Sequence, residues 1–359
     1  MSSDNLDIHY FSSLENSWNR LKNSQLPVYI YGMGDGCVKI LSQFKKYDIK
    51  CSGIFASDEF VRGQEFHGFK VCRYVDVKKC SDDFIIVPAF GTNLIDVMKR
   101  IEDLSRKHTL IMPDLPVFGD DYFSQEELFK RFSQVQEVYS ILCDDQSKSV
   151  LINVLSFKIT GDIRYLKNIF SDSSEAYQKI LHINNNEIYV DLGAYTGDTI
   201  AEFLESSNQK YEKIIAFEPN VKNYRKCVKN TLHLNNIEWY NAAAWNNDEV
   251  RFFSKNAGRQ ASVSFDGIPV QCRSVDSILK GNSCTYIKYD VEGADEQALV
   301  GSIETIRNFS PKICTALYHR PYDIIDLPLM LNEINPEYKM YIRQYPYYPC
   351  WETNLFCVK

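Results

Sequence analysis

Short apolar runs, glycine turns and amphipathic segments follow one another repeatedly in the first 123 residues. Residues 27–31 form the first apolar run, Gly32–Gly36 follows as a G-x-G-x-G turn, and apolar residues then recur at helical spacing over 38–44. This repetition predicts a parallel sheet with helices on its faces. The other strands predicted here are 51–55, 71–74, 84–87 and 110–112, and a second helix is predicted over 94–104.

After residue 123 the apolar residues follow helical spacing alone. Leu128 and Phe132, for example, fall on one face of a helix. Ser124 and Glu127 have the spacing of a capping box, which satisfies backbone donors at a helix start. The pattern therefore predicts a helical connector over 124–185.

From residue 186 the alternation of strand and helix returns, which predicts a second α/β domain over 186–359 after a first one over 1–123. Residues 250–253 and 270–275 are expected to add an antiparallel pair. The polar loop between them, 254–264, is a candidate lid. The remaining predicted elements are strands at 188–190, 214–217, 237–240, 286–290 and 313–317, helices at 199–204, 221–234 and 295–306, and a terminal antiparallel pair at 338–343 and 355–358.

Composition excludes several classes of function. The 359 residues carry a formal net charge of −7 and no long block of Lys and Arg, so nucleic acid is not expected as a main partner. The longest apolar run, 84–90, is too short to span a membrane, and the polar first ten residues lack the apolar centre of a signal peptide. The eleven cysteines are dispersed without a C-x-x-C pair, which is typical of reduced, buried thiols. A soluble cytoplasmic protein is expected.

The strongest chemical signal is the glycine turn after strand 188–190. Gly193 and Gly197 bracket this turn, and glycine there permits positive φ and close approach of a ligand to the backbone. Glu218 and Pro219 follow the next strand, about 20 residues further on, where nucleoside-binding sheets place an acidic partner for ribose hydroxyls. The combination predicts a nucleoside site, with a purely structural turn as the alternative.

Small residues follow the third strand of this domain. Asn241 is succeeded by Ala242 and Ala243, which leave room for a flat ring such as adenine. Tight packing of a helix on the sheet also requires alanine, so the two interpretations stay open.

Two titratable residues end neighbouring predicted strands. Asp290 and His319 both fall at carboxyl strand ends, the edge where open α/β sheets bind ligands, and are expected to face one crevice. A neutral His319 is a candidate general base. Asp290 has three candidate roles: orienting the imidazole, acting as the base, or holding a divalent cation with Glu292. For Glu292 the alternative is capping the next helix. No metal ligand set is predicted.

The motifs of the second domain together resemble the FkbM family of S-adenosylmethionine-dependent methyltransferases. They are Asp191-Leu-Gly-Ala-Tyr-Thr-Gly-Asp198, Phe217-Glu-Pro219, Asn241-Ala-Ala-Ala-Trp245, Lys288-Tyr-Asp-Val-Glu-Gly-Ala294 and Tyr318-His-Arg320.

The resemblance implies a class I fold, a seven-stranded sheet whose last strand is antiparallel, and methylation of hydroxyl oxygens of sugars or polyketides. It places the methionine end of the cofactor at Gly193, the ribose at Glu218 and the adenine at Asn241, with Asp290 and His319 near the methyl and the acceptor. Tyr195 stands where the family often has Asn. The full set of candidate cofactor residues is Asp191, Gly193, Ala194, Tyr195, Gly197, Asp198, Thr199, Glu218, Pro219, Asn241, Ala242 and Ala243.

The first domain resembles the N-terminal Rossmann-like domain of PglD-type sugar acyltransferases, through Tyr31-Gly-Met-Gly-Asp-Gly36 and Gly63-Gln-Glu-Phe-His-Gly68. That resemblance implies a nucleotide-sugar at Gly32–Gly36. A non-catalytic docking or dimer scaffold is the alternative, because fold does not settle function.

The sequence therefore predicts an O-methyltransferase acting on a sugar, a glycan or a glycosylated metabolite. The alternative from another enzyme class is an NAD-dependent sugar-nucleotide dehydrogenase or epimerase. Neither domain has a complete G-x-G-x-x-G with a second-strand acid, and the second lacks a Tyr-x-x-x-Lys pair, which disfavours that alternative.

Overall fold

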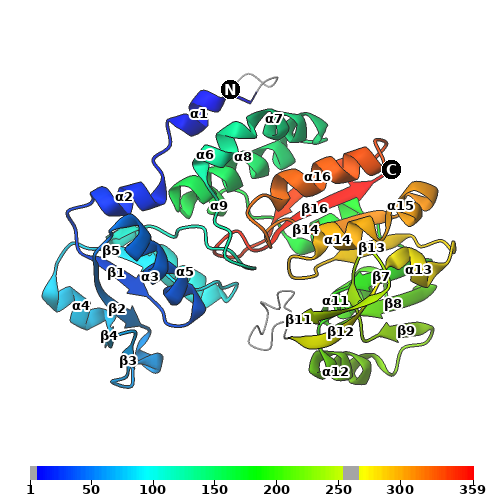
Figure 1. Ribbon diagram of the computed structural model, residues 1–359, viewed down its shortest axis with the longest axis horizontal. Helices are drawn as coiled ribbons and strands as arrows, with labels where there is room; N and C mark the ends of the chain where they lie inside the picture. Colours follow the sequence, from blue (N-terminus) through cyan, green and yellow to red (C-terminus); the bar gives the residue numbers. More distant parts are fainter. Residues whose placement is uncertain (1–5, 254–266) are drawn as a thin grey trace.

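A computed structural model of the chain describes residues 6–253 and 267–359. Its first part is a six-stranded sheet of order β3-β4-β2-β1-β5-β6, parallel except for the β3–β4 pair (Figure 1). All five predicted strands are present, and the short strand β3 is an addition that the pattern did not predict. The elements are α1 (Ile8–Ser12), α2 (Ser17–Asn23), β1 (Val28–Tyr31), α3 (Asp35–Tyr47), β2 (Cys51–Ala56), η1 (Asp58–Phe60), β3 (Glu65–Phe66), β4 (Phe69–Arg73), α4 (Tyr74–Cys80), β5 (Ile85–Pro88), α5 (Ile95–Lys107) and β6 (Thr109–Leu110).

The predicted connector is helical. Ser124 accepts a hydrogen bond from the Glu127 amide at 3.4 Å, but the amide of Ser124 donates to the hydroxyl of Tyr322 at 3.0 Å, so only half of the predicted capping box forms. The longest helix, α8, contacts β15 of the second large sheet. The elements are α6 (Gln125–Lys130), α7 (Phe132–Ile141), α8 (Asp145–Thr160), α9 (Arg164–Lys167), α10 (Ser173–Glu175) and η2 (Ala176–Ile180).

The second large sheet has seven strands in the order β15-β16-β14-β13-β7-β8-β9. Strand β16 pairs antiparallel with both of its neighbours, whereas every other pair is parallel. This confirms the expected seven-stranded α/β sheet with an antiparallel last strand. Its elements are β7 (Ile188–Leu192), α11 (Asp198–Ser206), β8 (Lys213–Phe217), α12 (Val221–Thr231), β9 (Ile237–Tyr240), β13 (Tyr286–Tyr289), α14 (Asp295–Val300), α15 (Ile303–Phe309), β14 (Lys312–Ala316), α16 (Asp323–Ile334), β15 (Lys339–Gln344) and β16 (Thr353–Val358).

The helix predicted over 295–306 is interrupted, because α14 and α15 are separated at Gly301. A Cβ at Gly301 would lie 2.0 Å from the carbonyl oxygen of Trp245, so the backbone approaches too closely for any other residue. The apolar spacing of the two short helices resembles that of one long helix, which explains the error.

A separate three-stranded sheet carries the predicted antiparallel pair. It has the order β10-β12-β11 and consists of β10 (Ala243–Ala244), β11 (Glu249–Phe253) and β12 (Ile268–Arg273), and it is followed by α13 (Val275–Leu279). The candidate lid, 254–264, lies outside the described residues.

One hydrophobic cluster extends through both large sheets and the connector. It contains Phe55 and Ile86 of the six-stranded sheet, Val154 of α8, and Ile287 and Leu355 of the seven-stranded sheet. The helices of the connector lie between the two sheets in Figure 1. The two parts of the chain are therefore packed through a shared core.

Two backbone contacts bring the carboxyl edge of the six-stranded sheet to the seven-stranded one. Thr92, which follows β5, exchanges hydrogen bonds of 2.7 and 3.0 Å with Tyr348, in the loop between β15 and β16. The bridging segment, residues 113–123, follows β6 and reaches His319, whose carbonyl accepts from the Phe118 amide at 3.3 Å.

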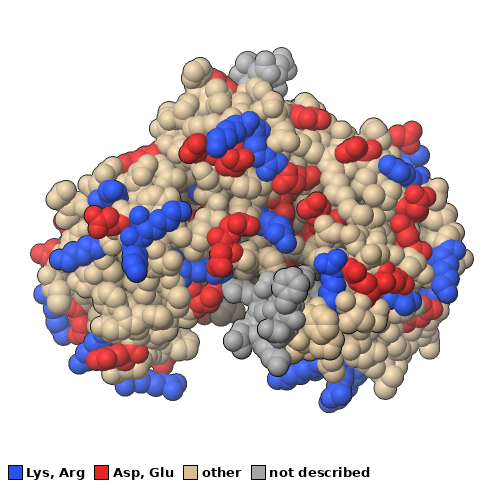
Figure 2. All heavy atoms as spheres, viewed as in Figure 1, with Lys and Arg blue, Asp and Glu red and all other residues tan. Residues whose placement is uncertain are grey.

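The described surface shows no extended basic stripe in the view of Figure 2, where acidic and basic side chains are interspersed. Within the described ranges, no helix combines the length and apolar character needed to cross a bilayer.

Candidate active site

The glycine turn after β7 lies directly against the end of β13. Gly193 has φ +96°, and a Cβ there would lie 2.0 Å from the carbonyl oxygen of Asp290. The amides of Gly193 and Ala194 both donate to the carbonyl of Phe217, at 3.0 and 2.8 Å. Since both the φ angle and the close contact exclude a side chain, glycine is required at this position.

The far end of the turn begins α11. Gly197 has φ +91° and precedes Asp198, which is exposed in the first turn of the helix. Thr199 donates its hydroxyl to Oδ2 of the fully buried Asp191 at 2.5 Å. Oδ1 of Asp191 has no hydrogen-bond partner among the described residues, although it is buried. A buried acceptor without a partner is costly unless a ligand or water meets it.

Glu218 connects the end of β8 to the glycine turn. Its Oε2 accepts from the amide of Tyr195 at 3.0 Å, and its Oε1 accepts from the amide of Asn220 at 2.7 Å. Tyr195 itself has φ +45° and an exposed side chain. Burial raises the pKa of Glu218 to about 7, despite the two backbone donors.

The raised pKa of Glu218 makes a testable prediction for stability. The folded chain favours the protonated form of Glu218. The stabilisation that comes from this raised pKa is fully present below the ordinary pKa of 4.5 and is lost as the pH rises through about 7. The stability of the wild type relative to Glu218→Gln should therefore fall by roughly 2–3 kcal/mol between pH 5 and pH 8. Urea unfolding of both proteins at the two pH values measures this change, and a pH-independent difference would contradict it.

The first residue after β9, Asn241, is exposed, whereas the alanines that follow it are buried. Asn241 donates to the carbonyls of Glu218 at 2.8 Å and of Pro219 at 3.1 Å, which ties the ends of β8 and β9 together. Ala242 and Ala243 are both buried, and Ala242 belongs to the large hydrophobic cluster. Packing thus accounts for the small size of Ala242, and a contact with a flat ring stays a prediction.

Asp290 and His319 do face one another. The Nε2 atom of His319 lies 3.3 Å from Oδ1 of Asp290, and Nδ1 lies 2.8 Å from Oδ2 of Asp295. Oδ2 of Asp290 accepts from Lys288 at 3.0 Å. The four side chains form a row of alternating charge, Lys288, Asp290, His319 and Asp295, of which His319 and Asp295 are 1% exposed.

This row determines the ionisation of the site. Burial alone would lower the pKa of His319, but Asp295 and Asp290 raise it well above its ordinary value. Burial alone would raise the pKa of Asp290, but Lys288 and His319 hold it below its usual range. The raised pKa favours the imidazolium form of His319 at neutral pH, which disfavours the expectation of a neutral His319 acting as general base. The lowered pKa favours the carboxylate form of Asp290, and contacts with Lys288 and His319 fix the orientation of this carboxylate.

Asp295 is the residue that the sequence interpretation missed. The apolar spacing predicts only that Asp295 begins a helix, and it does begin α14. Its carboxylate also accepts from the amides of Gly293 at 3.2 Å and Val291 at 3.4 Å, and so holds the turn in which Glu292 has φ +52°. The Glu292 carboxylate lies 3.9 Å from Nε2 of His319. An acid directly after the quoted motif Lys288–Ala294 was the available signal.

Metal binding receives no support from the geometry. Among the residues that the structure describes, no group of three or more His, Cys, Asp or Glu side chains is arranged to hold an ion.

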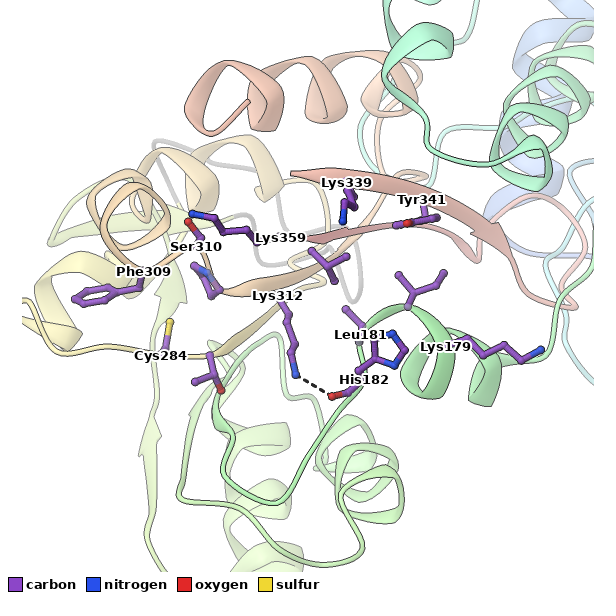
Figure 3. A pocket seen from close by; sticks show the side chains of 14 residues that line it. Lys179, Leu181, His182, Cys284, Phe309, Ser310, Lys312, Lys339, Tyr341 and Lys359 are labelled. Atoms are coloured by element: carbon purple, nitrogen blue, oxygen red, sulfur yellow. Dashed lines mark hydrogen bonds between the residues drawn. The ribbon is translucent and has the colours of Figure 1, made fainter. Parts of the chain in front are cut away.

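The predicted site residues gather at one edge of one sheet. Gly193 follows β7, Glu218 follows β8, Asn241 follows β9, Asp290 follows β13 and His319 follows β14, and these are five adjacent strands. A separate cavity of about 480 Å³ lies at the opposite edge, where Lys312 donates to the carbonyl of His182 (Figure 3). None of the predicted site residues lines it.

Comparison with known proteins agrees with this geometry. The family described as Methyltransferase FkbM domain matches residues 191–346, somewhat less than half of the chain. The crystal structure of Methyltransferase FkbM from Methylobacillus flagellatus KT superimposes with a TM-score of 0.73 at 18% identity, covering 99% of this chain and 94% of that one. No curated protein sequence matches.

Other solved structures resemble only part of the chain. An rRNA methylase from Streptococcus thermophilus has a TM-score of 0.33 at 11% identity, over 51% of this chain and 93% of that one. Fibrillarin from Aeropyrum pernix has a TM-score of 0.32 at 11% identity, over 49% of this chain and 68% of that one. Such low scores support no argument about this chain. The match to the FkbM methyltransferase domain covers residues 191–346, and this range contains every residue of the candidate site.

Proposed function

We propose that the chain is an S-adenosylmethionine-dependent O-methyltransferase whose acceptor is a hydroxyl group of a sugar, a glycan or a glycosylated metabolite. The observation that supports this most directly is the shared edge of the seven-stranded sheet, where the Gly193 turn lies between Glu218 and Asp290. Ligands of open α/β sheets bind at this carboxyl edge.

The residues present fit the proposed cofactor. The close approach at Gly193 leaves backbone accessible where a side chain would otherwise project, and the unpaired Oδ1 of Asp191 offers a buried acceptor for an ammonium group or a water. Each oxygen of Glu218 accepts one backbone donor and so retains a lone pair for a ribose hydroxyl. The cofactor would supply an electrophilic methyl group. The residues proposed to hold it are Asp191, Gly193, Ala194, Tyr195, Gly197, Asp198 and Thr199 around the methionine end, Glu218 and Pro219 at the ribose, and Asn241, Ala242 and Ala243 at the adenine.

Asp290 is the proposed proton acceptor. Asp290 would take the proton of the acceptor hydroxyl, which becomes strongly acidic as the oxygen gains the methyl group that the cofactor would supply. Asp290 can accept this proton despite its low pKa, because the proton leaves only after the acceptor oxygen has become strongly acidic. His319, as an imidazolium fixed by Asp295, orients the Asp290 carboxylate through the 3.3 Å contact and balances its charge. Positioning of this kind supplies much of the rate in a displacement reaction.

Binding of S-adenosylhomocysteine tests the cofactor assignment. We expect the wild-type chain to bind it in calorimetry, and Glu218→Ala to weaken binding at least about tenfold, because charge-assisted hydrogen bonds contribute roughly 1.5–3 kcal/mol. Glu205→Ala, at an exposed position of α11, is the matched control and should bind normally. Absence of binding heat with the wild type would remove the methyltransferase proposal.

The six-stranded sheet is proposed to recruit the acceptor as a nucleotide-sugar at Gly32–Gly36. Gly34 has φ +119° with open space around its Cβ position, and it begins α3 without a capping side chain. Gly36 packs against Ala89, where a Cβ would lie 2.1 Å from the carbonyl oxygen, so packing explains that glycine. A non-catalytic scaffold that mediates docking or a homodimer remains the alternative. Transfer of radiolabelled methyl to a panel of free sugars, sugar phosphates and nucleotide-sugars separates the two.

No observation favours the NAD-dependent alternative, and the cytoplasmic location stays a prediction.

A further inference from the structure

The bridging segment forms one wall of the catalytic edge. Besides the bond from the Phe118 amide to the His319 carbonyl, the ring of Phe118 packs on Gly293, where a Cβ would lie 2.8 Å from Cγ of the ring. Residues that follow the six-stranded sheet therefore touch the same turn and the same strand end that position Glu292 and His319.

Arg320 is fixed on this wall. Its guanidinium carbon lies 5.2 Å from the centre of the Phe118 ring, and its Nε donates to the carbonyl of Gly293 at 2.8 Å. Its backbone amide donates to Asp323 at 2.8 Å. The side chain is thus held at two points, although the residue is exposed to solvent.

The guanidinium of Arg320 has no salt-bridge partner among the described residues, and its electrostatic interaction with Asp323 involves no direct side-chain contact. Lys288 and His319 both contact Asp290, whereas Arg320 makes no salt bridge to any carboxylate of the described chain. Nε is used by Gly293, and the two terminal nitrogens have no hydrogen bond to a described residue. The planar guanidinium therefore presents two donor groups to solvent. Because the side chain is already fixed, binding of an anion would cost little rotamer entropy.

We propose that Arg320 binds an anionic group of the acceptor, a carboxylate or a phosphate, while Asp290, oriented by the neighbouring His319, accepts the proton of its hydroxyl. The inference rests on the proposed function and narrows its substrate class to acidic or phosphorylated sugars. A planar guanidinium matches both groups, because each presents two oxygens for parallel N–H···O bonds. Phe118 holds the guanidinium in place, which gives the bridging segment a part in specificity.

Calorimetry with three related sugars tests this inference. The full chain is saturated with S-adenosylhomocysteine and titrated with glucose, glucuronic acid and glucose 1-phosphate. We expect at least one of the two anionic sugars to bind about tenfold or more tighter than glucose, and the tighter one identifies carboxylate or phosphate as the preferred group.

Substitutions assign the preference to Arg320. Arg320→Gln should bring all three sugars to within about twofold of one another, and Arg320→Lys should keep only part of the preference, since it loses the planar fork. Arg307→Gln, at an exposed arginine of α15, is the control and should change nothing. Phe118→Leu should weaken the preference while the charge is retained.

The outcomes separate the two proposals. Equal binding of the three sugars, absence of measurable binding of both anionic sugars, or a preference that survives in Arg320→Gln would each overturn the role of Arg320. If the wild type did not bind S-adenosylhomocysteine, the proposed function would be refuted instead. Retained S-adenosylhomocysteine binding in each variant shows that the variant is folded.

Discussion

Asp295→Ala is expected to destabilise the folded chain by about 3–5 kcal/mol, the cost of breaking a buried ion pair by removing one partner. Asp295 and His319 are both 1% exposed and lie 2.8 Å apart. The substitution leaves an imidazolium nitrogen without its acceptor, and it removes the acceptor of the Gly293 amide. Urea unfolding of both proteins at pH 6 measures the difference.

Glu296→Ala is the control, because this neighbouring acid is exposed on α14 and its loss should change stability by less than about 0.5 kcal/mol. The pH dependence adds a second check. Since the pKa of His319 is raised in the folded chain, the stabilisation by its pairing is complete below about 6.5 and is lost as the pH rises through the raised pKa. The destabilisation caused by Asp295→Ala should therefore become smaller as the pH rises. If it became larger instead, this assignment would be contradicted.

Asp290→Asn is expected to lower methyl transfer by about 10²–10⁴-fold, the range for loss of a proton-transfer group. His319→Gln should lower it by about 10²-fold, because Asp290 loses the contact that orients it. Turnover is measured by radiolabelled methyl transfer to whichever member of the sugar panel the wild type accepts best. The affinity for S-adenosylhomocysteine should stay within about twofold in both variants.

These two substitutions discriminate between roles for the pair. If His319→Gln abolished transfer while Asp290→Asn retained most of it, His319 would be the proton acceptor and the assignment of Asp290 would fall. If both variants also lost S-adenosylhomocysteine, the two residues would act in cofactor binding or in folding.

The sheet edge was predictable because it depends on local patterns. A parallel strand ends where its apolar run ends, so Glu218, Asp290 and His319 could be placed at strand ends from their position after such runs. The number of strands and the antiparallel last strand came from the resemblance that the motifs carry, and the order of the seven strands was not predicted.

The ionisation of the site was not predictable in the same way. Whether His319 is neutral or charged depends on which carboxylates surround the imidazole, and Asp295 contacts it from a different element. The break at Gly301 has a similar origin, since it depends on the Trp245 carbonyl that approaches from the smaller sheet. Both features depend on contacts between segments distant in sequence.

The bridging segment also lacked any signal in the hydrophobic pattern. Phe118 could be read as one more apolar residue before the connector, yet the fold brings it to Arg320 and Gly293. Its place at the catalytic edge follows from the path of the chain between the two large sheets.

The hydrophobic cluster that runs through both sheets and α8 has a consequence for how the protein can be dissected. Severing the chain before Ser124 would leave each fragment with a large apolar face turned to water, which favours aggregation over independent folding. Heat or denaturant should accordingly melt the whole molecule in one cooperative transition, and the two halves would be inherited as an inseparable unit rather than as exchangeable modules.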